Sequence, residues 1–202
     1  MKIIEPSVEL MRDFDGAEVM KFLERCGRTA YQSEKNITED SAEKFIRNII
    51  KREHESVLEH FSCTFKIICD RGVMAELTRH RLASFTIEST RFNAYDELTF
   101  IKPEDFLLED DEFAHWKNLM KCIEVEYEYL RRTWCRPPEQ VRAILPSSLK
   151  TEIVMTANLR EWRTVLKLRT DKVAHPQMIQ VANMILEVLK EKLPIIFEDI
   201  GV

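Results

Sequence analysis

The chain has 202 residues, of which 45% are hydrophobic and 32% charged, a balance typical of a globular protein with a sizeable core. Its 30 Lys and Arg residues stand against 35 Asp and Glu, and the net charge of −5 argues against general nucleic-acid binding, which depends on neutralising many phosphates. The four glycines lie far apart, which excludes glycine-rich phosphate loops, so any bound phosphate must be held by side chains.

The predicted elements come from the spacing of apolar residues, which repeats every three to four positions in helices and every second position in half-buried strands. In chain order, the first half is predicted to contain helices at 17–27 and 41–50, a strand at 62–69, a helix at 73–82, an ordered loop at 83–96 and a short strand at 97–101. The second half is predicted to contain helices at 111–134 and 139–145, a strand at 149–156, and helices at 159–169 and 176–193. The pattern indicates one mixed α/β domain in which helix dominates, and Asp40 and Ser41 resemble a helix cap.

The five cysteines are widely spaced and include no C-x-x-C pair, so we expect neither a disulfide framework nor a zinc site. Cys63 and Cys69 fall within the apolar strand at 62–69 and are predicted to be core thiols. The sequence shows no basic and apolar signal-peptide pattern, and no apolar run approaches the ~20 residues of a membrane span. These features predict a cytoplasmic protein with no membrane partner.

The motif Arg79-His80-Arg81 lies where the helix at 73–82 runs into the loop. Helical neighbours two positions apart do not share a face, so the two arginines are expected to serve two different anions. Planar guanidinium groups suit phosphate. The loop adds further hydrogen-bond donors, at Ser89, Thr90 and Arg91. The alternative is a solvated basic helix end, which the helix dipole favours.

A second group of basic residues lies in the predicted helix at 159–169. Arg160, Arg163 and Lys167 share one side of that helix, and a solvated face with acidic neighbours is the alternative interpretation. Arg142 differs because its immediate neighbours are apolar. A buried arginine at that position would need an anionic partner.

His54 and His60 are six residues apart, whereas the H-E-x-x-H metal motif needs a spacing of four to place both imidazoles on one helix face. We expect them to line a turn or a pocket, and no metal site is predicted. Neither a G-x-S-x-G elbow nor an activated cysteine offers a nucleophile. An enzyme of this composition is expected to take its reactive electrons from a cofactor.

Residues 79–89 read R-H-R, seven residues and then Ser, which resembles the signature of the flavin-dependent thymidylate synthase family, also called thymidylate synthase complementing proteins. Further stretches resemble the family in order and spacing: HESVLEH at 54–60, RAILP at 142–146 and NLR at 158–160. The resemblance extends from about residue 20 to residue 197.

The resemblance implies a single α/β domain over 1–202, with a central sheet flanked by helices, that forms a homotetramer. It implies FAD bound between subunits and conversion of dUMP to dTMP. Methylenetetrahydrofolate would donate the carbon, reduced FAD the hydride, and NADPH would reduce the flavin again. No nucleic-acid partner is implied.

The resemblance also implies roles for individual residues. The positions that match flavin-binding residues are Ser56, Arg79, His80, Arg81, Asn158, Arg160, Thr164 and His175. The positions that match the dUMP site are Glu76, Arg79, Glu88, Ser89, Thr90, Arg91, Arg142 and Arg169. Arg169 matches the arginine that polarises the uracil ring, and a guanidinium near N3 and O2 would stabilise developing negative charge.

Thr86 and Ile87 depart from the family, which has polar or acidic side chains at these positions. Three alternatives to thymidylate synthesis remain open. One is a flavin- and folate-dependent uridylate modification with another product, such as hydroxymethylation. Another is a non-catalytic nucleotide-binding relative, suggested by Ile87. The last is nucleic-acid binding by the arginine clusters, against which the net charge of −5 argues.

Overall fold

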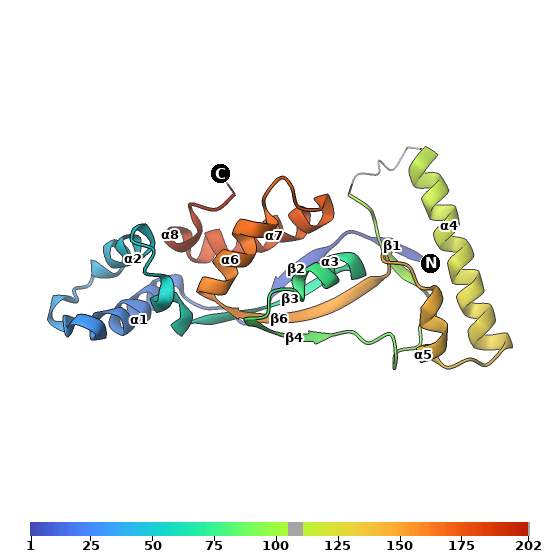
Figure 1. Ribbon diagram of the computed structural model, residues 1–202, viewed down its shortest axis with the longest axis horizontal. Helices are drawn as coiled ribbons and strands as arrows, with labels where there is room; N and C mark the ends of the chain where they lie inside the picture. The colour runs from blue at the N-terminus through green and yellow to red at the C-terminus, as the bar shows by residue number, and fades with distance from the viewer. Residues whose placement is uncertain (105–110, 202) are drawn as a thin grey trace. The chain divides into compact units, whose positions relative to one another are not determined.

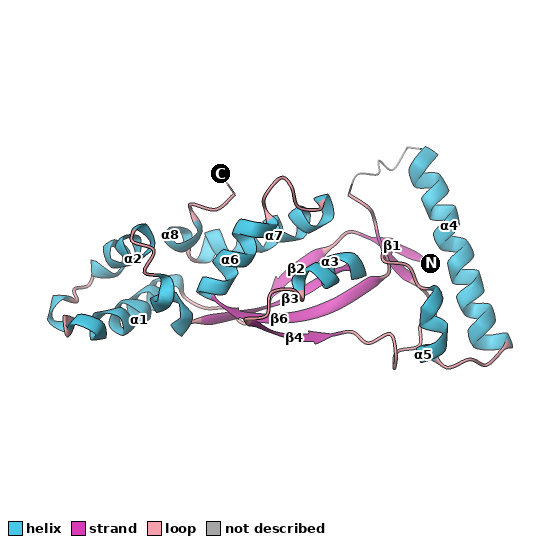
Figure 2. Cartoon of the chain, in the orientation of Figure 1, coloured by secondary structure: helices cyan, strands magenta, loops and turns pink. Residues whose placement is uncertain are grey.

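The computed structural model describes residues 1–104 and 111–201 (Figure 1). Helix outweighs strand, as Figure 2 shows, and the predicted mixed α/β, helix-rich class is confirmed. The helices are α1 (Gly16–Arg28), α2 (Ser41–Lys51), α3 (Arg71–Leu77), α4 (Asp111–Glu128), α5 (Pro138–Val141), α6 (Leu159–Arg169), α7 (Pro176–Lys192) and α8 (Pro194–Phe197). The strands are β1 (Lys2–Ile4), β2 (Ser7–Leu10), β3 (Ser62–Asp70), β4 (Ala83–Ile87), β5 (Thr99–Ile101) and β6 (Lys150–Asn158). Within the described ranges, every helix falls short of the length and apolarity that a membrane span requires.

The chain forms two compact units, each assembled from separate stretches of sequence. Unit 1 comprises Met1–Ser7, Ile67–Arg79 and Phe85–Val154. Unit 2 comprises Val8–Lys66, His80–Ser84 and Met155–Val202. The single domain expected from the sequence stays a prediction.

Two sheets contain the strands. The larger has the order β2-β3-β6-β4, and the smaller pairs β1 with β5 in parallel, with Ile3 opposite Phe100. The strands β3 and β6 run antiparallel. At one end Arg71 N donates to Ser147 O at 2.8 Å, and at the other Leu159 N donates to Phe61 O at 3.0 Å.

Strands β3 and β6 bury every second residue, which is the period of a half-buried strand. Cys63 and Cys69 are among the buried residues of β3, so the prediction of core thiols is confirmed. Burial raises the pKa of Cys63 to about 12 and also raises that of Cys69. Both thiols are therefore uncharged at neutral pH and unreactive.

The core of unit 2 forms around α6 and α7. Trp162 on α6 is fully buried, packs edge-on against Phe65 with ring centroids 5.2 Å apart, and donates its indole N–H to Cys63 O at 3.2 Å. Helix α7 packs on α6 with the apolar side of its turns, which includes Val181 and Ile185. This packing fixes α6, the helix that carries several predicted site residues.

The core of unit 1 joins α4 to the short strand β5. Its buried residues are Leu98, Phe100, Met120, Tyr127, Val141 and Leu149. The N-terminal amino group of Met1 lies 2.9 Å from Glu97 Oε1 and 2.8 Å from Glu124 Oε1. Glu124 also accepts a hydrogen bond from Leu98 N at 3.1 Å, so one buried carboxylate links the first residue to α4 and β5.

The structure corrects three predictions of local structure. The helix predicted at 73–82 is α3, which begins at Arg71 because the Asp70 side chain accepts a hydrogen bond from Val73 N at 2.7 Å, and which ends at Leu77. The loop predicted at 83–96 begins with strand β4, a sheet-edge strand with alternately exposed residues. The Asp40 side chain caps no backbone group, because Ser41 Oγ accepts a hydrogen bond from Thr38 N and donates to Glu24 instead.

Candidate active site

The motif Arg79-His80-Arg81 lies in the turn between α3 and β4 rather than on a helix, because α3 ends at Leu77. Arg79 and Arg81 are exposed, whereas His80 is buried with 7% of its surface accessible. Among the residues that the structure describes, neither of the two guanidinium groups has a hydrogen-bond or ion-pair partner. Both are therefore available to an anionic ligand.

His80 contacts two residues of α6 within unit 2. Arg169, the last residue of the helix, donates from Nε to His80 Nε2 at 3.0 Å. On the other side of the ring, His80 Nδ1 lies 3.7 Å from Glu161 Oε1. Burial, with a smaller contribution from the Arg169 charge, lowers the pKa of His80, so its imidazole is neutral at neutral pH. The structure thus brings together the predicted residues His80 and Arg169 and adds Glu161, which the sequence analysis missed.

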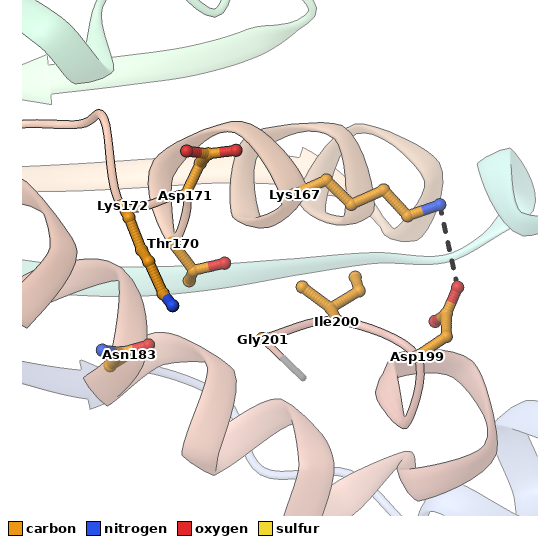
Figure 3. A pocket seen from close by; sticks show the side chains of 8 residues that line it. All are labelled: Lys167, Thr170, Asp171, Lys172, Asn183, Asp199, Ile200 and Gly201. Atoms are coloured by element: carbon orange, nitrogen blue, oxygen red, sulfur yellow. Dashed lines mark ion pairs between the residues drawn. The ribbon is translucent and has the colours of Figure 1, made fainter.

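A pocket of about 520 Å³ lies where α6 ends, between that helix, α7 and the C-terminal segment (Figure 3). Its lining includes Lys167, Asp171, Lys172, Asn183 and Asp199. Lys167 Nζ lies 3.8 Å from Asp199 Oδ2 across one side of it. The residues assigned from the resemblance do not appear in this lining.

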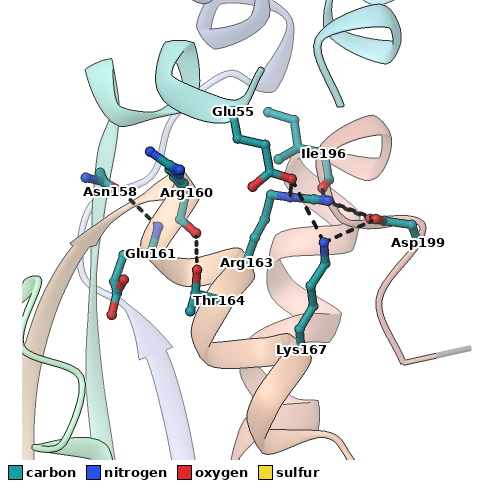
Figure 4. A network of polar contacts seen from close by, with 9 residues as sticks. All are labelled: Glu55, Asn158, Arg160, Glu161, Arg163, Thr164, Lys167, Ile196 and Asp199. Atoms are coloured by element: carbon teal, nitrogen blue, oxygen red, sulfur yellow. Dashed lines mark hydrogen bonds and ion pairs between the residues drawn. The ribbon is translucent and has the colours of Figure 1, made fainter. Parts of the chain in front are cut away.

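The N-cap and the first two turns of α6 carry three of the predicted flavin residues (Figure 4). Asn158 caps the helix by accepting a hydrogen bond from Glu161 N at 2.8 Å. Arg160 forms an ion pair with Glu59 Oε1 at 2.5 Å, and Thr164 Oγ1 donates to Arg160 O at 3.2 Å. These side chains already have local partners, so their flavin roles stay predictions.

Ser56, another predicted flavin residue, is exposed on the 3-10 helix Glu55–His60, which packs against α6. His175 is exposed at the start of α7, where its Nδ1 accepts a hydrogen bond from Gln177 N at 3.2 Å. The structure therefore brings Ser56 to the helix that carries Asn158, Arg160 and Thr164.

A buried arginine holds the 3-10 helix and the C-terminal segment onto α6 (Figure 4). Arg163 is 1% exposed and donates from Nε to Glu55 Oε1 at 3.0 Å. Its Nη1 and Nη2 bind the Asp199 carboxylate side-on, at 2.7 and 2.8 Å, and Nη1 also donates to Ile196 O. The alternative of a solvated basic face is wrong for Arg163. Its side chain is buried against the 3-10 helix Glu55–His60 and the C-terminal segment.

In unit 1, Glu88 is the centre of a second polar cluster. It accepts a hydrogen bond from the Tyr95 hydroxyl at 2.9 Å and pairs with Lys150 Nζ at 2.9 Å. Lys150 also contacts Glu152 Oε1 at 2.7 Å. Burial, reinforced by the Glu88 hydrogen bond, raises the pKa of Tyr95. Tyr95 and Lys150 belong to no recognisable sequence motif, so the sequence analysis did not find them.

Arg71 in the same unit has a buried guanidinium nitrogen, Nη1, without a hydrogen-bond partner among the described residues.

The remaining predicted dUMP-site residues of unit 1 lie in two places. Three come directly after Glu88 in the sequence, and two lie on short helices. Ser89 Oγ accepts a hydrogen bond from Arg91 N at 3.2 Å, and Thr90 is buried. Arg91 is exposed, with its Nε 3.2 Å from Glu139 Oε2. Glu76 is half-buried on α3.

Arg142 departs from the expectation drawn from its apolar neighbours. It is exposed on the 3-10 helix Arg142–Ile144. The preceding residue, Val141, occupies the buried position of this turn, and the Arg142 side chain lies at the surface. In the part of the chain that the structure describes, its guanidinium has no ion-pair partner. The residue is therefore open to a ligand rather than held in the core.

Several arginines have the chemistry to bind the phosphate groups of a cofactor or nucleotide. Arg79, Arg81 and Arg142 present exposed guanidinium forks, and Arg71 has a buried guanidinium nitrogen without a hydrogen-bond partner in the described ranges. Planar forks bind phosphate side-on with two parallel hydrogen bonds, and a buried donor without a partner is unfavourable until an acceptor satisfies it. Each of these guanidinium groups has, taken by itself, the chemistry to bind a phosphate group such as those of FAD or of a nucleotide.

Exposed arginines flank the buried His80 in the turn between α3 and β4, and guanidinium groups are suited to binding phosphorylated ligands. The family described as "Thymidylate synthase complementing protein" matches residues 13–195. The chain belongs to this family of enzymes, the flavin-dependent thymidylate synthases.

Individual relatives agree with this assignment. The chain is 34% identical to the flavin-dependent thymidylate synthase of Pyrococcus furiosus, over 82% of this chain and 70% of that protein. It is 31% identical to the flavin-dependent thymidylate synthase of Mycobacteroides abscessus, over 99% of this chain and 86% of that protein. The crystal structure of the UMP/dUMP methylase PolB from Streptomyces cacaoi, bound with 5-Br dUMP, matches with a TM-score of 0.79 and 24% identity, over 98% of this chain and 96% of that one. This last likeness establishes the fold.

Proposed function

We propose that this protein is a cytoplasmic, homotetrameric flavin-dependent thymidylate synthase that methylates dUMP to dTMP. Methylenetetrahydrofolate is the carbon donor and NADPH the reductant. The family match over 13–195 supports the reaction class. The structural neighbour, described as a UMP/dUMP methylase bound with 5-Br dUMP, supports a uridylate as the substrate.

The observation that carries this proposal is the contact between Arg169 and His80. Arg169 Nε donates to the neutral, buried ring of His80 at 3.0 Å, so this contact helps to hold the guanidinium in place. A uracil ring bound beside it would gain negative charge as C5 becomes nucleophilic, and a preorganised guanidinium stabilises that charge. This polarisation would allow methylation without attack by an enzyme thiol, and the buried thiols of Cys63 and Cys69 are protonated.

The cofactor's place in the proposal rests on the arginines of the turn between α3 and β4. When bound, reduced FAD supplies the hydride that completes the methyl group. Arg81 would hold the cofactor by a charge-assisted hydrogen bond to phosphate, and Arg79 is available for the same purpose or for the nucleotide.

The test begins with the absorbance spectrum of the purified protein, which is expected to be that of oxidised flavin. The protein is then supplied with methylenetetrahydrofolate, NADPH and either dUMP or UMP, and the product is identified by mass spectrometry. We expect dTMP from dUMP. A hydroxymethylated product, preferential use of UMP, or no product from any uridylate would each overturn the proposal.

Two arginine variants separate binding from catalysis. Arg81→Ala is expected to weaken FAD binding by about 10- to 100-fold, the value of one charge-assisted hydrogen bond. Arg169→Ala is expected to keep its flavin and to lose turnover by about 100- to 1000-fold, because transition-state charge is left unstabilised. Arg12→Ala, at an exposed arginine, serves as the control. Full FAD affinity in Arg81→Ala, or normal turnover in Arg169→Ala, would remove the role assigned to that residue.

A further inference from the structure

Helix α6 carries two side chains of opposite charge in one i, i+4, i+8 row. Glu161 and Arg169 are eight residues apart, which places them about 12 Å apart along the helix axis and about 80° apart around it. Helical side chains lean towards the N-terminus, so the long Arg169 side chain reaches back towards Glu161. Figure 4 shows Glu161 pointing away from the network around Arg163, on another side of α6.

The ring of His80 fills the interval between these two residues. Its Nε2 accepts the Arg169 Nε–H at 3.0 Å, and its Nδ1 lies 3.7 Å from Glu161 Oε1, within ion-pair range but longer than a hydrogen bond. The charged groups facing His80 in unit 2 are thus Glu161 and Arg169, both from α6. His80 and Glu161 are each 7% exposed, so water does not screen this contact.

The chemistry of the three groups determines the tautomer of the histidine. A guanidinium has donors and no acceptor, so the ring nitrogen that meets Arg169 must be unprotonated. A neutral imidazole then carries its proton on the other nitrogen, Nδ1, which faces Glu161. The tautomer that a free imidazole would prefer does not matter here, because Arg169 and Glu161 together determine which ring nitrogen carries the proton.

Burying the carboxyl group of Glu161 costs free energy unless another group compensates it. Burial raises the pKa of its carboxyl group, and among the described residues no Lys or Arg forms an ion pair with it. The Asn158 hydrogen bond satisfies the backbone N–H of Glu161 and leaves the carboxylate itself to His80.

We propose that Glu161 is a positioning residue: its carboxylate faces the Nδ1–H of His80 at 3.7 Å, favours that tautomer by electrostatic attraction and thereby orients the Arg169 guanidinium. The tautomer follows from the geometry alone. The consequence for catalysis rests on the proposed function, in which Arg169 polarises the uracil ring.

The tautomer is tested by long-range proton–nitrogen NMR of the holoenzyme with labelled histidine, at neutral pH. The His80 signal is assigned by its loss in His80→Asn. We expect the Nδ1–H tautomer in the wild type and in Glu161→Gln, whose amide oxygen can still face Nδ1. In Glu161→Leu, which offers no acceptor, the Nε2–H tautomer becomes populated. A wild-type ring protonated at Nε2, or a ring unchanged in Glu161→Leu, would overturn the inference.

Turnover of dUMP is measured in the same variants. Glu161→Leu is expected to lose about 10- to 100-fold in kcat, the cost of a misplaced catalytic group, whereas Glu161→Gln stays within about threefold of the wild type. The thermal midpoint of Glu161→Leu should stay level or rise, because an apolar group replaces a buried carboxylate. Glu187→Leu, at an exposed position on α7, is the control.

The NMR measurement and the turnover measurement together distinguish a failure of this inference from a failure of the proposed function. A wild-type protein that makes no dTMP refutes the proposed function, and the NMR measurement still decides the role of Glu161. A wild-type protein that makes dTMP, together with an unchanged kcat in Glu161→Leu, refutes the positioning role.

Discussion

Replacing Arg163 with Met removes the residue that connects three separate parts of unit 2. The guanidinium joins α6 to Glu55 of the 3-10 helix, to the Asp199 carboxylate and to Ile196 O. Methionine fills much of the same space and cannot donate a hydrogen bond. The substitution therefore leaves two carboxylates and one buried carbonyl without their principal partner.

The magnitude follows from the exposure of these partners. Removing one member of a buried ion pair costs about 3–5 kcal/mol. The Asp199 side chain is 42% exposed and can regain water, and Lys167 Nζ remains 3.8 Å from it, so the lower end of that range applies. We expect a loss of about 3 kcal/mol in the free energy of unfolding, or about 6–12 °C in the thermal midpoint of a chain of this size.

Differential scanning calorimetry of the apoprotein measures this loss without a contribution from bound flavin. Arg12→Met, the same substitution at an exposed arginine, is the matched control and should stay within about 0.5 kcal/mol of the wild type. If Arg163→Met melts within a degree or so of the control, the buried ion pair contributes nothing net, and the reasoning from burial and hydrogen bonding is refuted.

Two further predictions concern the same unit. Hydrogen bonding from Arg163 lowers the pKa of Asp199 in the folded protein below its unfolded value, so the stability it contributes is present above about pH 4 and is lost as pH falls towards the folded pKa. The difference in thermal midpoint between the wild type and Asp199→Asn should therefore shrink from about pH 5 to about pH 3, and a constant difference would contradict the assignment. A Cβ at Gly16 would overlap the Lys192 backbone carbonyl, so Gly16→Ala should lose about 3 kcal/mol in unfolding experiments. Gly72→Ala, whose Cβ would lie 3.2 Å from Asp70 Oδ1, is the control, and equal losses in the two variants would count against the overlap.

The sequence by itself determined the long elements and the family. Apolar residues at helical spacing located α1, α2, α4, α6 and α7, and alternation located β3 and β6, because burial of one face leaves a periodic trace in the chain. The motif Arg79-His80-Arg81 with Ser89 carried the resemblance, since its residues lie within one short stretch. Strand β4 also alternates apolar and polar residues, but over five positions only, and so short a run was not distinguished from the loop that follows it.

Only the tertiary structure decided which charged side chains meet. His80 and Arg169 are 89 positions apart, and Arg163 and Glu55 are 108 apart, so no local pattern could join them. Burial of Arg163 and exposure of Arg142 reversed what their neighbours suggested, because helix packing chooses which side of a turn faces the core. The spacing of apolar residues along the chain shows which face of a helix or strand is buried. Which other segment packs against that face depends on contacts between residues that are far apart in the sequence.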